Sequence, residues 1–337
     1  MQLAQRQMRV SAGIRGSRAR VVSVQAAKDP KGPRIAVVGV TGAVGQEFLT
    51  VLHERNFPYS SIKLLASASR SSSRAASPVS LRRRRASPEL SWSAGKQQEF
   101  EGETYTIEEL TENSFGDVDI ALFSAGGSIS KKLGPVAAKA GAVVVDNSSA
   151  FRMTEGVPLV IPEVNPEAMA HVKIGGGGAI IANPNCSTII ALMAVTPLHR
   201  VSKVKRMIVS TYQAASGAGA AAMEELRSQT KDVLEGKPAN PQIFPHQYAF
   251  NLFSHNSGMD VEVGYNEEEL KLVKETKKIW GTTDVKIAAT CVRVPVMRAH
   301  AESINLEFES PVSEDEAREA LSKAAGVSII DDRANNR

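Results

Sequence analysis

Apolar residues gather in short runs that alternate with amphipathic stretches over the first half of the chain. Near-continuous apolar runs predict buried strands at residues 34–39, 61–66, 119–126, 142–148, 159–164 and 179–184. Helical spacing of apolar positions predicts helices at 43–55 and around 128–140. Strands that are apolar on both faces and alternate with helices are typical of a parallel sheet covered on both sides. The pattern therefore predicts a doubly wound α/β domain over residues 31–185.

The pattern of apolar positions changes after Asn185. It predicts helices at 186–199, 218–234, 267–280 and 314–325, and strands at 205–213, 285–296 and 302–310. Ser313 and Glu316 have the spacing of a capping box at the start of the last helix. The last two strands alternate polar and apolar positions, which indicates a sheet with one exposed face. Residues 186–337 are predicted to form a separate α+β domain.

The basic residues are concentrated in two stretches. The formal net charge of +4 would on its own be compatible with a nucleic-acid partner. Residues 1–30 and 69–92 each contain six Lys or Arg and one acidic residue, and the rest of the chain holds 28 basic and 34 acidic residues. Because this remaining body is mildly acidic, the composition argues against nucleic-acid binding.

The first 30 residues have the composition of a targeting segment. Arg at positions 6, 9, 15, 18 and 20 is combined with small residues, and no acidic residue precedes Asp29. This is typical of an organelle transit peptide, with an ordinary disordered tail as the alternative. We expect a disordered transit peptide at residues 1–30 and a location in the plastid stroma.

The sequence gives no indication of a membrane-spanning helix, a disulfide framework or a zinc site. No apolar run reaches the ~18 residues that a membrane-spanning helix needs, so no membrane association is expected. The two cysteines, Cys186 and Cys291, are far apart and form no C-x-x-C motif. This argues against a disulfide framework and a zinc site and fits reduced thiols in a stroma-like compartment.

A glycine-rich turn joins the first predicted strand to the first predicted helix. Gly39, Gly42 and Gly45 stand in the stretch GVTGAVG. Glycine there permits a tight turn and lets a diphosphate approach the backbone N–H groups at the positive end of the helix. The strand–turn–helix context favours a dinucleotide site over a purely structural turn.

The end of the second predicted strand favours NADP over NAD. An NAD site usually has Asp or Glu there, which accepts hydrogen bonds from the ribose hydroxyl. The stretch LLASASR at 64–70 has no acidic residue, and Arg70 stands beside the expected place. A guanidinium suits a 2′-phosphate through paired, charge-assisted hydrogen bonds.

Cys186 stands in the stretch NPNCST, between a predicted strand and the start of a predicted helix. The helix dipole favours a thiolate there by about 0.3–1 kcal/mol, so we expect the pKa of Cys186 to be lowered. The alternative is a buried cysteine that acts as a small apolar residue, and it fits Cys291 inside a strand. A thiolate beside a nicotinamide implies a thiohemiacetal or thioester, with hydride transfer at a carbon held on sulfur.

That chemistry requires a general acid or base. The chain contains six histidines, and their spacing does not choose among them. His53 and His199 are expected near helix ends, whereas His171, His246 and His255 are expected in loops.

Several motifs together resemble a known enzyme family. They are, in chain order, VGVTGAVGQE, DNSSAFRM, PLVIPEVN, NPNCSTI, STYQAASGAG, ETKKI and CVRVPVMRAHAES. The chain resembles aspartate-semialdehyde dehydrogenases from about residue 33 to its end, apart from residues 71–92. The resemblance implies an NADP-dependent oxidoreductase that reduces L-aspartyl-4-phosphate to L-aspartate 4-semialdehyde and inorganic phosphate, in lysine, threonine and methionine biosynthesis. It also implies a Rossmann-like NADP-binding domain, an α+β catalytic and dimerisation domain, and a homodimer or homotetramer.

The resemblance implies three catalytic residues. Cys186 would be the nucleophile that forms the acyl thioester. His300 would be the general acid and base, and Gln213 would orient the bound acyl group.

The resemblance also implies four residues that bind charged parts of the substrate. Arg293 would bind the α-carboxylate with its planar fork, and Glu268 would bind the α-amino group. Arg152 and Lys271 would hold the phosphate that is displaced. Read singly, Arg152, Glu268 and Lys271 would be surface charges, and Glu268 with Lys271 could be a helix pair of little energetic consequence.

For the cofactor, the resemblance implies contacts from the turn, from the second strand and from the second domain. The residues concerned are Gly39, Thr41, Gly42, Ala43, Val44 and Gly45 at the diphosphate, Arg70, Ser71 and Ser93 at the 2′-phosphate, and Ser216 and Gly217 at the nicotinamide.

The chain departs from the family pattern at two places. Residues 71–92 are rich in Ser, Arg, Pro and Ala and have no periodicity that could build a core. Removing them joins LLASASR directly to SAGKQQEF, as the family pattern requires. We interpret them as a translated intron or gene-model error, with a tolerated surface loop as the alternative. The resemblance further implies a strand and a helix after DDRANNR, so that the C-terminal part of the family fold is expected to be missing.

Two alternatives to the aspartyl-phosphate reaction stay open. One is an enzyme like N-acetylglutamyl-phosphate reductase, against which Glu268 argues because that substrate has no free amine. The other is an inactive, truncated product.

Overall fold

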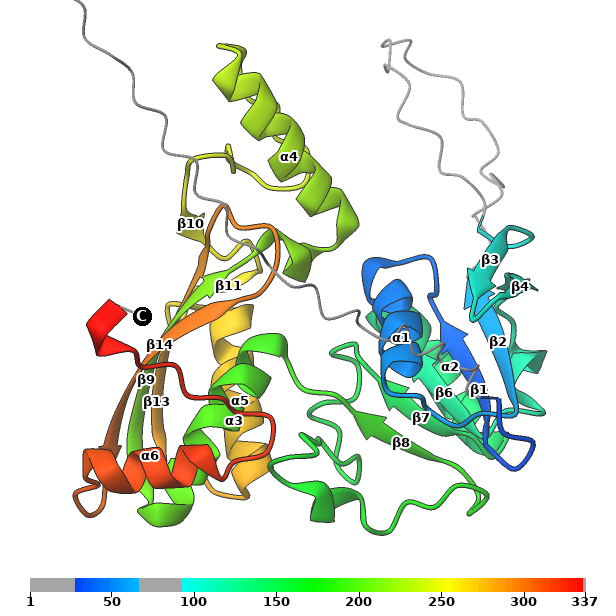
Figure 1. Ribbon diagram of the computed structural model, residues 1–337, viewed down its shortest axis with the longest axis horizontal. Coiled ribbons are helices and arrows are strands. Elements are labelled where there is room, and N and C mark those ends of the chain that lie inside the picture. The colour runs from blue at the N-terminus through cyan, green and yellow to red at the C-terminus, as the bar shows by residue number, and fades with distance from the viewer. Residues whose placement is uncertain (1–27, 67–92, 336–337) are drawn as a thin grey trace, which may run out of the picture.

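The computed structural model describes residues 28–66 and 93–335. The predicted transit peptide and the predicted insertion lie outside the described residues, apart from the three residues 28–30, and so do Arg70 and Ser71. Two lobes lie side by side, with α1, α2 and the first sheet in one and α3, α5 and the second sheet in the other (Figure 1).

The first lobe contains a six-stranded sheet in the order β5-β2-β1-β6-β7-β8, in which every pair of neighbours is parallel. This confirms the predicted α/β class. The elements are β1 (Arg34–Val38), α1 (Ala43–Glu54), β2 (Ser61–Ala66), β5 (Glu108–Glu109), β6 (Ile120–Phe123), α2 (Gly127–Lys139), β7 (Val143–Asp146) and β8 (Ala179–Ala182). A hairpin of β3 (Gln97–Phe100) and β4 (Glu103–Thr106), which the sequence did not predict, stands beside it.

Both faces of this sheet are buried. Ile35 and Val37 of β1 pack into one apolar cluster with Leu49 of α1, whereas Ala36 and Val38 belong to a second cluster with Leu133 of α2. Successive strand residues point to opposite faces, so the continuous apolar run of β1 supplies both clusters.

The strand predicted at 159–164 is wrong. Leu159 forms only an isolated parallel bridge with Ala182 of β8, and the chain then turns away. Pro162 has no N–H to donate to a ladder, which explains why the apolar run does not continue as a strand. Its apolar residues are buried against β8 and α3 instead.

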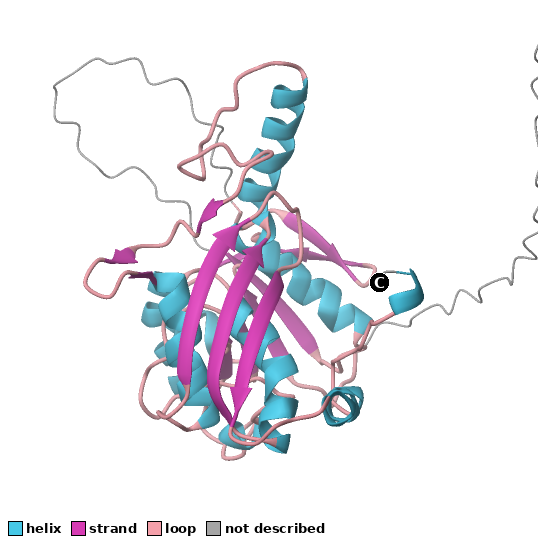
Figure 2. Cartoon of the chain, turned by 90° about the vertical axis from the view of Figure 1, so that its left-hand side faces the viewer, coloured by secondary structure: helices cyan, strands magenta, loops and turns pink. Residues whose placement is uncertain are grey.

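The second lobe is built on a four-stranded mixed sheet in the order β10-β13-β9-β14. β9 (Val204–Gln213) is parallel to β13 (Lys286–Arg293) and antiparallel to β14 (Ala301–Phe308), and β10 (Phe253–Ser254) pairs with the end of β13. Helices α3 (Cys186–Val201) and α5 (Glu267–Trp280) lie behind the sheet in Figure 2, and its other face is open. The expectation of one exposed sheet face is confirmed.

The remaining elements are short or peripheral. Helix α4 (Ala220–Leu234) projects from the second lobe, and α6 (Glu314–Ser322) begins with the predicted Ser313 and Glu316 capping box. The others are the strands β11 (Met259–Asp260) and β12 (Tyr265–Asn266) and the 3-10 helices η1 (Glu112–Phe115), η2 (Pro166–Met169), η3 (Ala215–Ala218) and η4 (Arg333–Asn335). None of the helices in the described part of the chain is long and apolar enough to cross a bilayer.

Candidate active site

The start of α3 is organised by the residue that precedes Cys186. Asn185 caps the helix, since its Oδ1 accepts hydrogen bonds from the backbone N–H groups of Ser187 (3.0 Å) and Thr188 (3.3 Å). An Asn cap satisfies N–H groups that a helix start leaves without partners. Cys186 is the first residue of the helix, and its side chain is exposed.

The prediction of a lowered pKa for Cys186 is wrong for the free protein. Desolvation by the surrounding protein and the negative charge of Glu268 raise the pKa of this thiol, although the residue still reaches solvent. The Ser187 N–H and the charges of Arg293 and Arg152 act in the opposite direction without overcoming them. The helix-dipole contribution of about 0.3–1 kcal/mol is smaller than the desolvation of a crowded thiol next to a carboxylate. Cys291, by contrast, is buried within β13, and burial raises its pKa to about 12, as expected for an unreactive cysteine.

Gln213 ends β9 and is fully buried beside Cys186's helix. Its Nε2 donates to the Ser187 hydroxyl (2.6 Å) and to Glu268 Oε1 (3.2 Å), whereas its Oε1 has no hydrogen-bond partner among the described residues. The amide is therefore held in one orientation by its nitrogen.

Glu268 lies in the first turn of α5 and is a charged group at the centre of the site. Its Oε1 accepts from Asn185 Nδ2 (2.8 Å), and its Oε2 accepts from Lys271 Nζ (3.0 Å). Burial acts to raise the pKa of Glu268, but the charge of Lys271 and these hydrogen bonds outweigh it and hold the pKa at about 2. Glu268 is thus a carboxylate at neutral pH, and its contact with Lys271 is part of a buried network rather than an isolated surface pair.

Arg293 ends β13 in register with Gln213 of β9. Its Nη1 donates to the Ala214 carbonyl (3.1 Å) and its Nη2 to His255 Nε2 (2.8 Å). Burial and the Arg293 charge lower the pKa of His255 to about 4, so the ring is neutral and able to accept this bond. The sequence placed His255 in a loop without a role, because nothing in its spacing shows that the loop folds back onto Arg293.

His300 stands two residues before Glu302, at the entrance of β14. Its Nδ1 accepts from the Ala214 N–H (3.0 Å), so the proton of the neutral ring is on Nε2. Burial and the Arg293 charge lower the pKa of His300. A Cβ added to Gly217 would lie 2.9 Å from His300 Cε1 and 3.1 Å from Arg293 Nη1, so this glycine leaves room for both side chains.

Arg152 follows β7 and is buried. Its Nη1 forms an ion pair with Glu275 of α5 (3.1 Å), its Nε donates to the Asn183 carbonyl (2.9 Å), and its Nη2 donates to the Asn147 carbonyl. Glu275 also accepts from the Asn185 N–H (2.6 Å). Arg152 is therefore fixed beneath the start of α3, and its partner Glu275 was not singled out from the sequence.

The glycine turn has the shape that a diphosphate needs. Gly39 has φ +86°, and a Cβ on Gly45 would lie 2.2 Å from the Gly39 carbonyl oxygen. Gly42 precedes α1 without a side-chain cap, and Thr41, Gly42 and Val44 are exposed with Ala43 half-buried. The first N–H groups of α1 are thus accessible to an anion. The structure fits a dinucleotide here, and no residue other than glycine would fit at Gly39 or Gly45.

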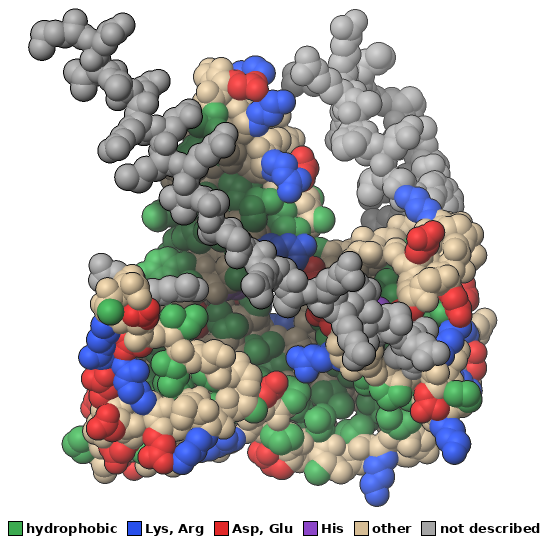
Figure 3. Space-filling view, viewed as in Figure 1, with side chains coloured by type: hydrophobic (Ala, Val, Ile, Leu, Met, Phe, Trp, Pro, Cys, Tyr) green, Lys and Arg blue, Asp and Glu red, His purple; other side chains and the backbone are tan. Residues whose placement is uncertain are grey.

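The other cofactor positions are only partly described. Ser216 and Gly217 lie in η3, next to His300 and Arg293. Ser93 precedes β3 at the start of the turn to Lys96. The surface is hollowed between the two lobes, with basic side chains at the edge of the hollow (Figure 3).

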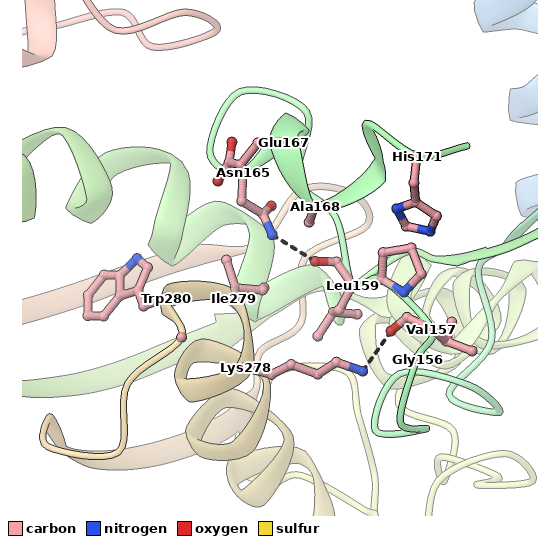
Figure 4. A pocket seen from close by; sticks show the side chains of 12 residues that line it. Gly156, Val157, Leu159, Asn165, Glu167, Ala168, His171, Lys278, Ile279 and Trp280 are labelled. Carbon is pink, nitrogen blue, oxygen red and sulfur yellow. Dashed lines mark hydrogen bonds between the residues drawn. The ribbon is translucent and has the colours of Figure 1, made fainter. Parts of the chain in front are cut away.

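A second hollow of about 460 Å³ lies between the loop at 156–171 and the end of α5. Figure 4 shows Lys278 donating to the Val157 carbonyl and Asn165 donating to the Leu159 carbonyl at its wall. None of the predicted site residues lines it, and Lys278 is used there to tie the loop to α5. We therefore place the site at the start of α3.

The structure brings together five of the predicted residues through shared contacts. Gln213, Glu268 and Lys271 are joined by hydrogen bonds, and Arg293 and His300 meet around Gly217 and Ala214. Cys186 precedes Ser187, which binds Gln213. Among the described residues, Arg152 forms no hydrogen bond or ion pair with Lys271, and it reaches the site through Glu275 and Asn185 instead.

A dinucleotide-binding lobe joined to a second lobe built on a mixed sheet is the architecture of an NAD(P)-linked oxidoreductase. The sequence model described as "Semialdehyde dehydrogenase, NAD binding domain" matches residues 34–172, and "Semialdehyde dehydrogenase, dimerisation domain" matches residues 195–337. The chain belongs to the aspartate-semialdehyde dehydrogenase family.

Individual relatives support this assignment. The chain is 48% identical over 307 residues to aspartate-semialdehyde dehydrogenase of Synechocystis sp., covering 91% of this chain and 82% of that protein. It is 49% identical to the Aquifex aeolicus protein of the same name, with 90% and 82% covered. The crystal structure of aspartate semialdehyde dehydrogenase II from Vibrio cholerae, solved also in complex with ASA, matches with a TM-score of 0.77 at 40% identity, covering 88% of this chain and 80% of that one.

Proposed function

We propose that the chain catalyses the NADP-dependent reductive dephosphorylation of L-aspartyl-4-phosphate to L-aspartate 4-semialdehyde, through a thioester on Cys186. The observation that carries the proposal is the arrangement at the start of α3, where an exposed thiol lies beside a carboxylate, a buried Arg and a buried amide. This arrangement matches an acyl group whose other end carries an ammonium and a carboxylate.

Substrate charge complements the charges of the site. Arg293 offers a planar fork to the α-carboxylate, and its hydrogen bonds to Ala214 and His255 fix the plane of that fork. Glu268 is ionised and suits the α-ammonium group. Binding a free amine here explains why a carboxylate is kept charged in a buried place.

The reaction then needs two steps at one carbon. The Cys186 thiolate attacks the acyl carbon, the C–S bond forms, the bond to the phosphate oxygen breaks, and inorganic phosphate leaves. NADPH, when bound, supplies a hydride to that carbon. The C–S bond then breaks, so the aldehyde leaves and the thiolate is restored. In this scheme the substrate carbonyl oxygen lies near Gln213 and His300.

In this proposal His300 transfers a proton to or from the substrate at Nε2, because its Nδ1 already accepts a hydrogen bond from the Ala214 N–H. Charge that develops on the substrate oxygen is stabilised by hydrogen-bond donors already in place. The predicted role of His300 as acid and base and that of Gln213 in orienting the acyl group stay predictions.

Lys271 and Arg152 are proposed to neutralise the phosphate. Lys271 already contacts Glu268, and Arg152 contacts Glu275. A dianionic phosphate would therefore share each cation with a protein carboxylate. This sharing favours release of the phosphate after it has been displaced.

The cofactor is proposed to be NADP(H). Gly39, Gly42 and Gly45 and the open start of α1 fit the diphosphate, and Gly217 adjoins His300 where the nicotinamide is expected. The choice of NADP over NAD rests on Arg70, which lies outside the described residues. A related enzyme from Candida albicans has been solved with NADP.

We propose a homodimer formed through the second lobe and a location in the plastid. The matched dimerisation domain and the open face of the β13-β9-β14 sheet support the dimer (Figure 2), and a homotetramer stays an alternative. The composition of residues 1–29 alone supports import into a plastid.

The test is phosphate-dependent reduction of NADP⁺ with L-aspartate 4-semialdehyde, followed by absorbance and compared with N-acetyl-L-glutamate 5-semialdehyde. It is run on the chain as it stands and on a variant without residues 71–92. Turnover with the aspartyl substrate is expected, and activity only with the acetylated substrate would overturn the proposal. No turnover by either version, when both are folded, would favour an inactive product.

A further inference from the structure

Glu302 is a half-buried acidic residue whose two carboxyl oxygens are buried and which the proposed reaction does not use. It is the second residue of β14, two residues after His300 in the chain, and its side chain lies on the less exposed face of that strand. The strand register aligns Glu302 with Thr211 of β9 and aligns Thr211 with Cys291 of β13. Glu302, Thr211 and Cys291 therefore form one row of side chains across the sheet. Gln213 belongs to the next row on the same face, which α3 covers.

The Glu302 carboxyl group has an unusual environment. Both of its oxygens are buried without a partner in hydrogen-bond geometry among the described residues. The Ser187 hydroxyl is near enough to lower the pKa of Glu302 in part, but burial dominates and raises that pKa to about 8. At neutral pH the group is therefore an uncharged carboxylic acid, which has an O–H to donate.

Ser187 connects this carboxylic acid to the catalytic centre. It follows Cys186 in α3, and its hydroxyl accepts the 2.6 Å hydrogen bond from Gln213 Nε2. A hydroxyl oxygen has two lone pairs, so one is free for a second donor. Since Gln213 is held by its nitrogen alone, whatever fixes the Ser187 hydroxyl also fixes the Gln213 amide.

We propose that uncharged Glu302 is a positioning residue that donates its O–H to the Ser187 hydroxyl and thereby holds the Gln213 amide beside Cys186. The charge state matters as much as the contact. An ionised Glu302 would lose the donor and would add a second carboxylate near Glu268, where a thiolate and an anionic substrate must also be accommodated.

Cys291 on β13 lies in register with Thr211 and interacts with the charge of Glu302. The other ionisable groups at this end of the second lobe are Cys186 on α3, Glu268 and Glu269 on α5, and His300 and Arg293 beside the ends of β14 and β13. Glu268 is already ionised far below neutral pH, and Cys291 titrates only at about 12. An ionisation near pH 8 that Glu302→Gln abolishes therefore belongs to Glu302.

The kinetic test rests on the proposed function and compares pH profiles of kcat and kcat/KM from pH 6.5 to 9.5 for the wild type, Glu302→Gln and Glu302→Leu. Glu307→Gln is the matched control, since it makes the same change on the outward face of the same strand. We expect the wild type and the control to lose activity above about pH 8, and Glu302→Gln to keep it. Glu302→Leu should lose about tenfold in kcat with a smaller change in KM, because the acyl-orienting amide is loosened. Wild-type behaviour of Glu302→Leu, or an alkaline loss retained in Glu302→Gln, would overturn the inference.

An infrared measurement separates this inference from the proposed function. The difference spectrum between wild type and Glu302→Gln at pH 7 should contain the C=O band of a protonated carboxylic acid, which disappears as the pH is raised through about 8. The same band should be present in Cys186→Ala, which has no turnover. If the wild type lacks activity but shows the band, the proposed function fails and the charge state of Glu302 stands. A folded wild type without the band overturns the inference whatever its activity.

Discussion

Replacing Gly217 with Ala should impair catalysis by displacing two side chains at once. The added Cβ would lie 2.9 Å from His300 Cε1, 3.0 Å from His300 Nε2 and 3.1 Å from Arg293 Nη1. Carbon and nitrogen atoms pack without strain at about 3.5–4.0 Å, so one or both side chains must move by roughly 0.5–1 Å. Both are tied to Ala214 by hydrogen bonds and cannot move without weakening them.

The size of the effect follows from the displacement. A shift of about 1 Å in a catalytic group can cost 100-fold in rate, so we expect a loss of about 10- to 100-fold in kcat/KM, equivalent to about 1.4–2.7 kcal/mol. Steady-state kinetics with L-aspartate 4-semialdehyde, phosphate and NADP⁺ measures it. Gly116→Ala is the control, because its Cβ would meet nothing within 4 Å and its φ is −62°. Activity of Gly217→Ala within twofold of the wild type would refute the steric reasoning.

Three further predictions concern ionisable residues of the site. Arg293→Lys should lower kcat/KM by about tenfold or more, mainly through KM, because one arm of a charged fork is lost; unchanged kinetics would remove Arg293 from the substrate site. Glu268→Gln should move the pH midpoint of Cys186 alkylation by iodoacetamide downwards, because the Glu268 charge raises the pKa of that thiol, while turnover falls; an unmoved midpoint would contradict this electrostatic account. Glu302 keeps its proton up to about pH 8 in the folded state but loses it near pH 4.5 when unfolded, so wild-type stability should fall as the pH rises between these values. In chemical denaturation, the free energy of unfolding of Glu302→Gln should thus exceed that of the wild type by on the order of 3 kcal/mol at pH 7 and should equal it below pH 4.5. A variant with the stability of the wild type at both pH values would show that burial does not keep Glu302 protonated.

Much of the fold could be predicted because its signals are local. The apolar runs of β1, β2, β7 and β8 and the spacing of α5 lie within single elements, and the structure reproduces them closely. Pro162 shows the limit of this reasoning, because an apolar run of strand length there forms only one bridge. The β3–β4 hairpin was missed because its strands are short and mostly polar.

In the candidate site, too, residues with a local signal could be predicted, whereas their distant partners could not. Gln213 and Arg293 end two parallel strands, and their register brings them together. Their partners could not be found in this way, since His255, Glu275 and Ser187 reach the site from a loop and two helices. The pKa of Cys186 was predicted in the wrong direction because a sequence shows the helix dipole but not the desolvation or the neighbouring Glu268.

Trapping the acyl-enzyme tests the central claim that Cys186 carries the substrate. The protein is incubated with L-aspartate 4-semialdehyde and NADP⁺ without phosphate, digested under acid conditions and analysed by mass spectrometry. We predict one β-aspartyl group on the peptide that contains Cys186, none on the peptide that contains buried Cys291, and loss of the modification when phosphate is added. Phosphate-dependent NADPH formation by a Cys186→Ala variant, or an acyl group on any other residue of an active wild type, would contradict the account.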